Sequence, residues 1–123
     1  MREYAIYETL VSSMGNGDSY VVKEFDDLES AKKYLQDKQD EIDAICKDLT
    51  NTWKDLIKHF GYAFESTMNN STLMIEIHKF ENNDNGIVES VIEDIEIDKD
   101  DFDYIQEYIM DEQYKDEQES DDE

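Results

Sequence analysis

Three side chains in this sequence could supply metal ligands or a nucleophile, namely His59, His78 and Cys46. His59 stands at the end of an expected helix, where a protonated imidazole would interact favourably with the helix dipole. His78 is expected in a strand, facing away from Ile77. Neither histidine has a cysteine or an acidic residue at metal-ligand spacing, and nothing around Cys46 signals a catalytic base or cationic pocket. We therefore expect structural roles for all three.

The familiar motifs of enzymes and cofactor sites are missing from the sequence. It contains no G-x-S-x-G, P-loop, G-x-G-x-x-G or H-E-x-x-H pattern. The segment ENNDNGIVESVI (81–92) follows a calcium loop in its alternating oxygen-bearing residues and in Gly86 at the sixth position. Its twelfth position is Ile92, where the bidentate glutamate of such a loop belongs. We expect a hairpin turn here, and no metal, no cofactor and no enzymatic activity in the chain.

Carboxylates are the abundant functional groups. The 123 residues include 34 acidic and 11 basic ones, with a formal net charge of −23. Residues 81–123 hold 19 of the acidic residues and two of the basic ones. So negative a surface repels phosphate, which opposes direct binding to nucleic acid or to an anionic membrane. Partners that respond to this charge are expected to be basic.

The elements that position these groups begin with a predicted β-hairpin. Glu3–Val11 and Ser19–Phe25 are β-branched and aromatic runs with alternating polarity. Gly15-Asn16-Gly17 between them can supply the positive φ angles of a tight turn. The N-terminus has no apolar run of signal-peptide length, and no segment approaches the ~20 apolar residues of a membrane span.

A helical stripe follows over residues 28–60. Leucine or isoleucine recurs every seven residues from Leu28 to Leu56, which is typical of a helix with one buried face. Asp26 or Asp27 can cap its start, and Gly61 can end it. The segment forms one long helix or two, because Thr50 or Asn51 offers a second N-cap.

The rest of the chain predicts three strands and a last helix. YAFEST, STLMIEIHKF and GIVESVIEDIEI are separated by the turn segments MNNS and ENNDNG, which favours a three-stranded antiparallel meander. A β-bulge is expected around Glu93-Asp94, where the apolar phase changes. A helix over Asp100–Tyr114 follows, capped by Asp98 or Asp100. The fold class is thus α+β, with one domain over residues 1–115 and an acidic disordered tail over 116–123.

One face of the last helix is the candidate binding surface. Its acidic residues recur three and four positions apart, opposite an apolar stripe that includes Phe102 and Ile109. No lysine interrupts the row of acidic residues before Lys115. The helix carries one negative charge per about 3.7 Å of its length, close to the ~3.4 Å per charge along one DNA strand. The preceding strand continues the pattern. The residues expected to contact a partner are Glu89, Glu93, Asp94, Glu96, Asp100, Asp103, Tyr104, Glu107, Asp111 and Tyr114.

The small size, the charge and the acidic segment VESVIEDIEIDKDDFDYIQEYIMDE resemble a class of phage and mobile-element proteins that mimic DNA. This class includes anti-restriction proteins, anti-CRISPR proteins and uracil-DNA glycosylase inhibitors. The resemblance implies a non-enzymatic inhibitor that occupies a basic nucleic-acid channel, such as that of a Cas effector or restriction nuclease. It implies a cytoplasmic location, in the host cell if the protein is phage-encoded, and the single cysteine also favours a reducing compartment. Two alternatives stay open: an immunity protein that neutralises a cationic nuclease toxin, and an acidic domain without any mimicry.

Overall fold

A computed structural model of the chain describes residues 2–12 and 17–121 and has an α+β architecture. Its four strands form one antiparallel sheet in the order β2-β1-β3-β4. The predicted fold class is therefore confirmed. The elements, in chain order, are β1 (Tyr4–Val11), β2 (Gly17–Phe25), α1 (Leu28–Lys47), α2 (Trp53–His59), the short 3₁₀ helix η1 (Ser66–Asn70), β3 (Thr72–Asn83), β4 (Gly86–Asp98) and α3 (Lys99–Asp121).

The N-terminal hairpin forms as the sequence predicts. β1 pairs with β2 from Tyr4 opposite Phe25 to Val11 opposite Gly17, with a bulge in β2 at Val22. The predicted turn falls largely on residues 13–16, which lie outside the described residues. Gly17 allows the two strands to approach closely and is not needed for a positive φ angle. A Cβ at this position would lie 2.9 Å from the Leu10 carbonyl oxygen.

The segment 28–60 forms two helices. Asp27 caps α1 by accepting a hydrogen bond from the Ser30 N–H at 2.8 Å, which confirms one of the two predicted caps. α1 ends at Lys47, and the next residue, Asp48, accepts a hydrogen bond from the Thr50 N–H at 3.0 Å through its carboxylate. Such local bonds between side chain and backbone compete with continuation of a helix. Thr52 then caps α2, one position beyond the predicted Asn51.

α2 ends as predicted. His59 is its last residue, and Gly61 adopts a φ of 88° that stops the helix.

The predicted three-stranded meander is wrong in its first strand, because only the second and third strands form. Residues 62–65 have no regular structure, and η1 follows them. Tyr62 and Phe64 of this loop and Met68 of η1 pack against the core instead. The Trp53 Nε1–H donates to the Met68 carbonyl at 2.9 Å, which fixes the loop to α2. The alternating pattern therefore reflects packing of a loop, not pairing of a strand.

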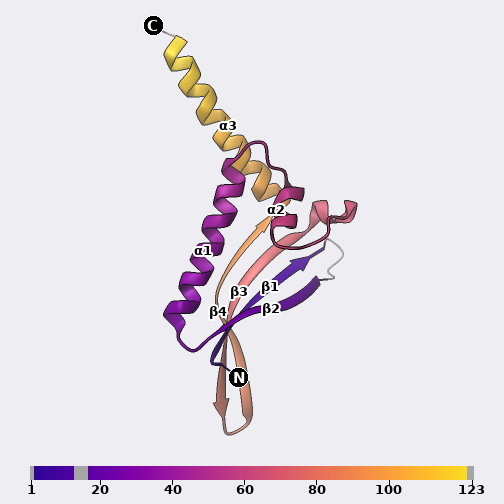
Figure 1. The fold of residues 1–123 in the computed structure, drawn as a ribbon, viewed down its shortest axis with the longest axis vertical. Coiled ribbons are helices and arrows are strands. Elements are labelled where there is room, and N and C mark those ends of the chain that lie inside the picture. The colour runs from indigo at the N-terminus through magenta and orange to yellow at the C-terminus, as the bar shows by residue number, and fades with distance from the viewer. Residues whose placement is uncertain (1, 13–16, 122–123) are drawn as a thin grey trace.

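β3 and β4 form the long hairpin that the Asn-Gly turn predicts. Their pairing runs from Thr72 opposite Asp98 to Asn83 opposite Gly86, whose φ is 115°. The register shifts so that Ile92 is the extra residue of a β-bulge, one position before the predicted site. β1 ends its pairing at Lys79, so the tip of the hairpin continues as a two-stranded ribbon that projects from the sheet (Figure 1).

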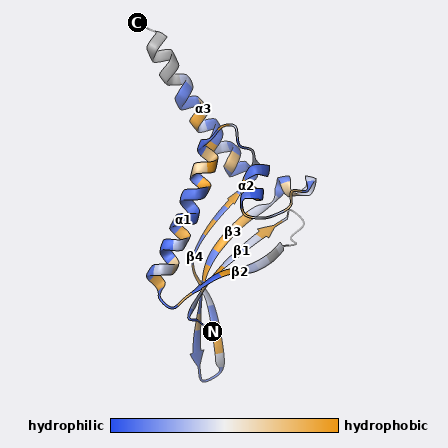
Figure 2. Cartoon of the chain, viewed as in Figure 1, coloured by the Kyte–Doolittle hydropathy of each residue, from blue (hydrophilic) through white to orange (hydrophobic). Residues whose placement is uncertain are grey.

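The core lies between the helices and one face of the sheet. Leu35 and Ile42 of α1 are buried together with Ile6, Ile75 and Ile77 of the central strands. In Figure 2 apolar residues recur as short bands along α1 and the strands, which is the spacing that such a two-layer core requires. Within the described residues, no helix is both long enough and apolar enough to cross a membrane.

α3 starts one residue before the predicted Asp100 and ends later than predicted, and Asp98, one of the two predicted caps, caps it. The Asp98 Oδ1 accepts from the Asp101 N–H at 2.7 Å, and the Asp101 carboxylate accepts from the Asp98 N–H at 3.3 Å, a reciprocal capping box. The helix was expected to end near Tyr114, ahead of a disordered tail, but it continues to Asp121. Nothing in this stretch stops a helix, since it lacks proline and glycine and contains lysine, glutamate and glutamine.

Candidate functional site

The rotation of α3 about its axis is set by two contacts with the rest of the fold. Phe102 is 1% exposed and meets the Trp53 ring edge-on, with the ring centroids 6.1 Å apart. One turn further on, the Gln106 side-chain amide donates to the carbonyls of Asn51 at 2.9 Å and Asp48 at 3.3 Å. Through these two bonds Gln106 joins α3 to the loop between α1 and α2, and this side of α3 lies against the rest of the fold.

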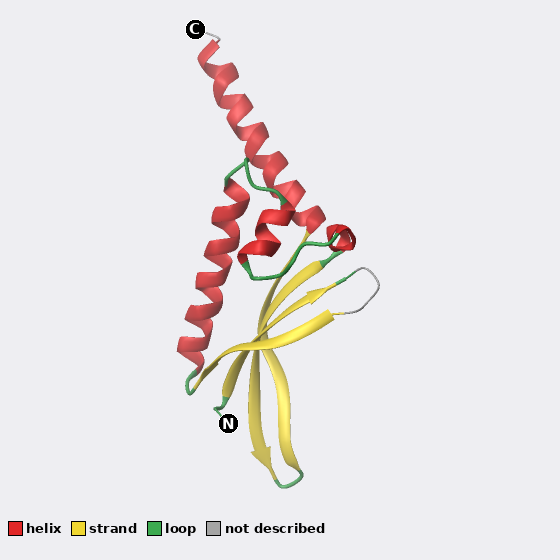
Figure 3. Ribbon diagram, turned by 45° about the vertical axis from the view of Figure 1, so that its right-hand side comes forward, coloured by secondary structure: helices red, strands yellow, loops and turns green. Residues whose placement is uncertain are grey.

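The opposite side of α3 faces solvent, and we call it the α3 acidic face. By helical spacing it is about half a turn away from Phe102. Tyr104 is 70% exposed and Tyr114 is 61% exposed, although tyrosine carries a large apolar area. Beyond α1 the helix extends away from the other elements (Figure 3). The α3 acidic face consists of Asp100, Asp103, Tyr104, Glu107, Asp111 and Tyr114.

One carboxylate of this face is already paired. Lys99, the first residue of α3, places its Nζ 2.7 Å from the Asp103 carboxylate. The expectation that no lysine enters the stripe before Lys115 is therefore wrong, because the helix begins one residue earlier than predicted. Asp100, Glu107 and Asp111 are exposed and form no ion pair among the described residues. They are the carboxylates that can meet a cation of a partner.

The predicted acids of β4 do not share one surface with α3. Glu89, Asp94 and Glu96 lie opposite Phe80, Glu76 and Met74, on the sheet face that the helices leave open.

Glu93 lies opposite the core residue Ile77, so it points to the helix side. There it lines a groove between β4 and α1. The ten predicted residues thus divide into the α3 acidic face, the open face of the sheet and one position in this groove.

His78 has acidic neighbours that sequence spacing does not reveal. Its Nδ1 lies 2.5 Å from the Glu89 carboxylate, and its Nε2 lies 3.5 Å from the Glu76 carboxylate. The imidazole also stacks on Tyr7, with the ring centroids 4.1 Å apart. Burial, followed by the charges of Glu89 and Glu24, raises the pKa of Tyr7. Glu89 is therefore a partner of His78 within the fold, which makes it a weaker candidate for outside contacts.

The remaining candidates for chemistry are inert or structural. Cys46 is completely buried, and burial together with the charge of Asp43 raises the pKa of its thiol to about 11. A thiol in this state stays protonated and is not a nucleophile. His59 Nε2 lies 4.0 Å from the Glu41 carboxylate near the end of α2. In the described part of the chain, no group of three or more His, Cys, Asp or Glu side chains could hold a metal ion.

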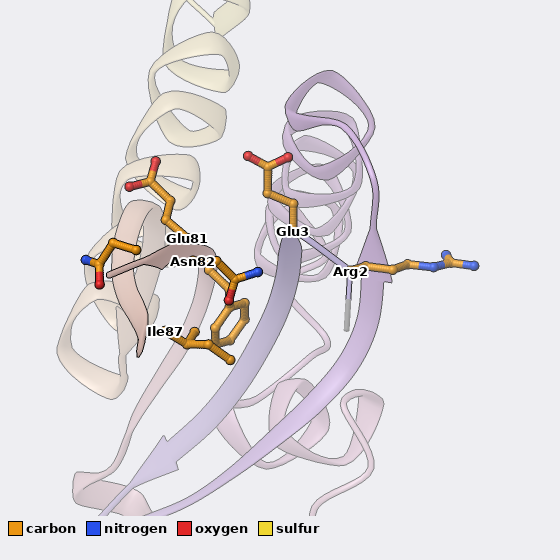
Figure 4. A pocket seen from close by; sticks show the side chains of 7 residues that line it. Arg2, Glu3, Glu81, Asn82 and Ile87 are labelled. Atoms are coloured by element: carbon orange, nitrogen blue, oxygen red, sulfur yellow. The ribbon is translucent and has the colours of Figure 1, made fainter. Parts of the chain in front are cut away.

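A hollow of about 530 Å³ lies where the β3–β4 ribbon leaves the sheet. It is lined by residues that include Glu3, Glu81 and Ile87 (Figure 4). Arg2 points away from it, with its guanidinium 3.8 Å from the Asp26 carboxylate. The polar groups around this hollow do not converge on one point, so it lacks the geometry of a site that would orient a small substrate.

Comparison with protein-family models, with curated proteins and with solved structures finds no match to this chain.

Proposed function

We propose that this chain is a non-enzymatic inhibitor that binds the basic nucleic-acid channel of a host defence nuclease, of the anti-CRISPR or anti-restriction kind. The α3 acidic face is the observation that carries the proposal. It joins exposed carboxylates with two largely exposed tyrosines on a helix whose orientation is held by Phe102 and Gln106. Aromatic residues and charge complementarity are the features by which protein interfaces gain affinity and rapid encounter.

In this mechanism the carboxylates of α3 take the place of backbone phosphates. Lysine and arginine side chains that normally neutralise DNA would pair with Glu107 and Asp111, and Tyr104 would pack against the apolar stems of those side chains. The net charge of −23 would speed encounter with a basic channel at low salt. Such an inhibitor needs no catalytic group or cofactor, and it would act in the cytoplasm, where its target is found.

The test measures DNA cleavage and DNA binding by two purified enzymes, an RNA-guided Cas nuclease and a restriction nuclease, with increasing amounts of the chain. The wild type is expected to inhibit at least one of them at near-stoichiometric amounts and to compete with its DNA. The double variant Glu107→Lys, Asp111→Lys should weaken inhibition by at least about a hundredfold, because it places two cations against a basic channel.

The matched control is Asp37→Lys, Asp84→Lys, which makes the same change in net charge at two exposed positions outside α3. Neither aspartate forms an ion pair among the described residues, so this variant should inhibit like the wild type. A chain without residues 115–123 should also inhibit, because the α3 acidic face ends at Tyr114. If both double variants lose inhibition equally, net charge alone is responsible and the proposed face is wrong. Neutralisation of a cationic nuclease toxin, without any effect on the two defence nucleases, would favour an immunity protein.

A further inference from the structure

β4 is an edge strand of unusual length and charge. It pairs with β3 on one side, and the sheet order places no strand of the described chain on its other side. It spans 13 residues, whereas strands in globular proteins are usually about five or six residues long. Natural proteins protect such edges with lysine, proline or short strands. β4 contains neither lysine nor proline, so its protection comes from the bulge at Ile92, from its acidic side chains and from Glu93, a charge that points to the helix side.

The two faces of β4 differ in chemistry. On the open face of the sheet its acids Asp94 and Glu96 are exposed and form no ion pair among the described residues. On the helix side Ile95 is partly buried and Ile97 is buried. Towards the hairpin tip Val88 is 46% exposed and Val91 is 51% exposed. Over Asp94–Ile97 a neighbouring strand would thus meet acids on the open face and aliphatic side chains on the helix side, whereas beyond the bulge Val91 lies opposite His78, on the open face.

A groove beside this edge provides room for side chains on the helix side. It has a volume of about 470 Å³ and runs between α1 and β4. Leu35 and Ile95 form its apolar part, Gln36, Gln39 and Glu93 supply polar groups, and Lys32 and Lys33 of α1 also line it, so a side chain that enters this groove should be uncharged. A strand added to β4 would direct every second side chain towards this groove and the others towards the open face.

We propose that the outer edge of β4 binds an extended basic segment of a partner protein, which adds to the sheet as a fifth strand. The segment has lysine or arginine at alternate positions, facing Asp94 and Glu96, and aliphatic residues between them that enter the α1–β4 groove. Main-chain hydrogen bonds supply affinity and the alternating side chains supply specificity, as in other cases of strand addition.

Charge complementarity selects this occupant over a second copy of the chain. Two β4 edges side by side would bring carboxylates next to one another, and like charges on paired strands are destabilising. A basic segment would relieve the repulsion that Asp94 and Glu96 exert on each other. The site is separate from the α3 acidic face, and it can exist whether or not the chain inhibits a nuclease.

The test uses the full chain labelled with ¹⁵N and a blocked synthetic peptide of four Lys-Val repeats, at 150 mM salt, where long-range charge effects are screened. The control peptide has the same composition in the order Lys-Lys-Val-Val, repeated, so that its valines do not share one face. The alternating peptide is expected to bind at least about tenfold more tightly. It should shift β4 resonances and slow hydrogen exchange along β4. Equal binding of both peptides, or shifts confined to α3, would overturn the proposal.

Backbone pairing is tested with two further peptides, one N-methylated at each lysine and the other at each valine. One edge of a strand carries the N–H groups of alternate residues, so one of the two peptides should bind at least about tenfold more weakly and the other should retain binding. Full retention by both would exclude strand addition.

Two protein variants separate this site from the proposed inhibitory face. Asp94→Lys, Glu96→Lys should abolish the preference for the alternating peptide. Glu107→Lys, Asp111→Lys makes an identical change in net charge on α3 and should leave that preference intact. If the α3 variant alone loses binding, the peptide binds to α3 and the β4 proposal is wrong. Because this readout involves no nuclease, it stands or falls independently of the inhibition assay.

Discussion

At the residue scale, the largest departure from ordinary packing is Glu8, a carboxylate on the core side of β1. It is 7% exposed and lies opposite Ile75. Burial raises its pKa, and a hydrogen bond from Tyr62 and the charge of Lys38 offset this effect only partly. Glu41 adds a second carboxylate nearby and raises the pKa of Glu8 further. The fold therefore carries an ionisable group whose charged form it disfavours.

Glu8→Gln should stabilise the protein increasingly as the pH rises. In the wild type the folded-state pKa of Glu8 lies above its unfolded value, so the unfolded state loses its proton first and the free energy of unfolding falls through this window. Glutamine has no such proton to lose. Urea unfolding between pH 4 and pH 8 should show a gap between variant and wild type that widens with pH and then becomes constant.

Glu24→Gln is the control for that experiment, because it removes an exposed carboxylate. A gap that stays constant over the whole range, or that narrows as the pH rises, would contradict the assignment to Glu8. The salt should be kept constant, since all carboxylates of this chain repel one another more strongly as they ionise.

At the element scale, α3 depends on a few contacts for its position. The helix is held near its start by Phe102 and Gln106, while its outer face is polar and exposed. Packing of an apolar face usually determines the stability of a helix more than propensity does. The orientation of the α3 acidic face should therefore be sensitive to changes on the opposite side of the helix.

Gln106→Leu should lower the free energy of unfolding by about 1–2 kcal/mol, because it leaves the carbonyls of Asp48 and Asn51 without their donor. It should also weaken nuclease inhibition, although Gln106 lies away from the α3 acidic face. Urea unfolding and the cleavage assay provide the two readouts. Gln113→Leu, an exposed position further along the helix, is the matched control. Equal losses in the two variants would show that Gln106 does not position the helix.

At the scale of the whole molecule, charge opposes compactness. The acidic regions project in opposite directions from the body, with α3 at one end and the β3–β4 ribbon at the other (Figure 1). This arrangement keeps many of the carboxylates apart, and it presents two surfaces that differ in shape. One is the α3 acidic face, and the other is the tip of the β3–β4 hairpin. The β4 edge at Asp94–Ile97 lies in the four-stranded part of the sheet and not on the ribbon.

The melting temperature should rise by several degrees when NaCl is increased from 0.1 M to 1 M. Over that range the screening length falls from about 10 Å to about 3 Å, so repulsion among the carboxylates weakens. Differential scanning calorimetry measures the effect. The Glu107→Lys, Asp111→Lys variant should show a smaller rise, because fewer like charges remain. A melting temperature independent of salt would mean that local ion pairs already balance the charge.

Much of the local structure could be predicted from the sequence, because it depends on neighbouring residues. The Asp27 and Asp98 caps, the Gly61 stop and the Asn85-Gly86 turn each act within a few positions of the chain. Period-two and helical patterns likewise indicated both hairpins and the helices. The same reasoning was wrong over residues 62–67, because an alternating aromatic pattern fits a packed loop as well as a strand.

By itself, then, the sequence determined the α+β class, the two hairpins, the candidate caps of α1 and α3 and the excess of negative charge. Only the tertiary structure decided how that charge is distributed. Glu89 pairs with His78, 11 positions away, and Glu93 points to the helix side of the sheet. A carboxylate's role depends on what lies opposite it in space, and strand register, a β-bulge and helix rotation set this through contacts distant in sequence.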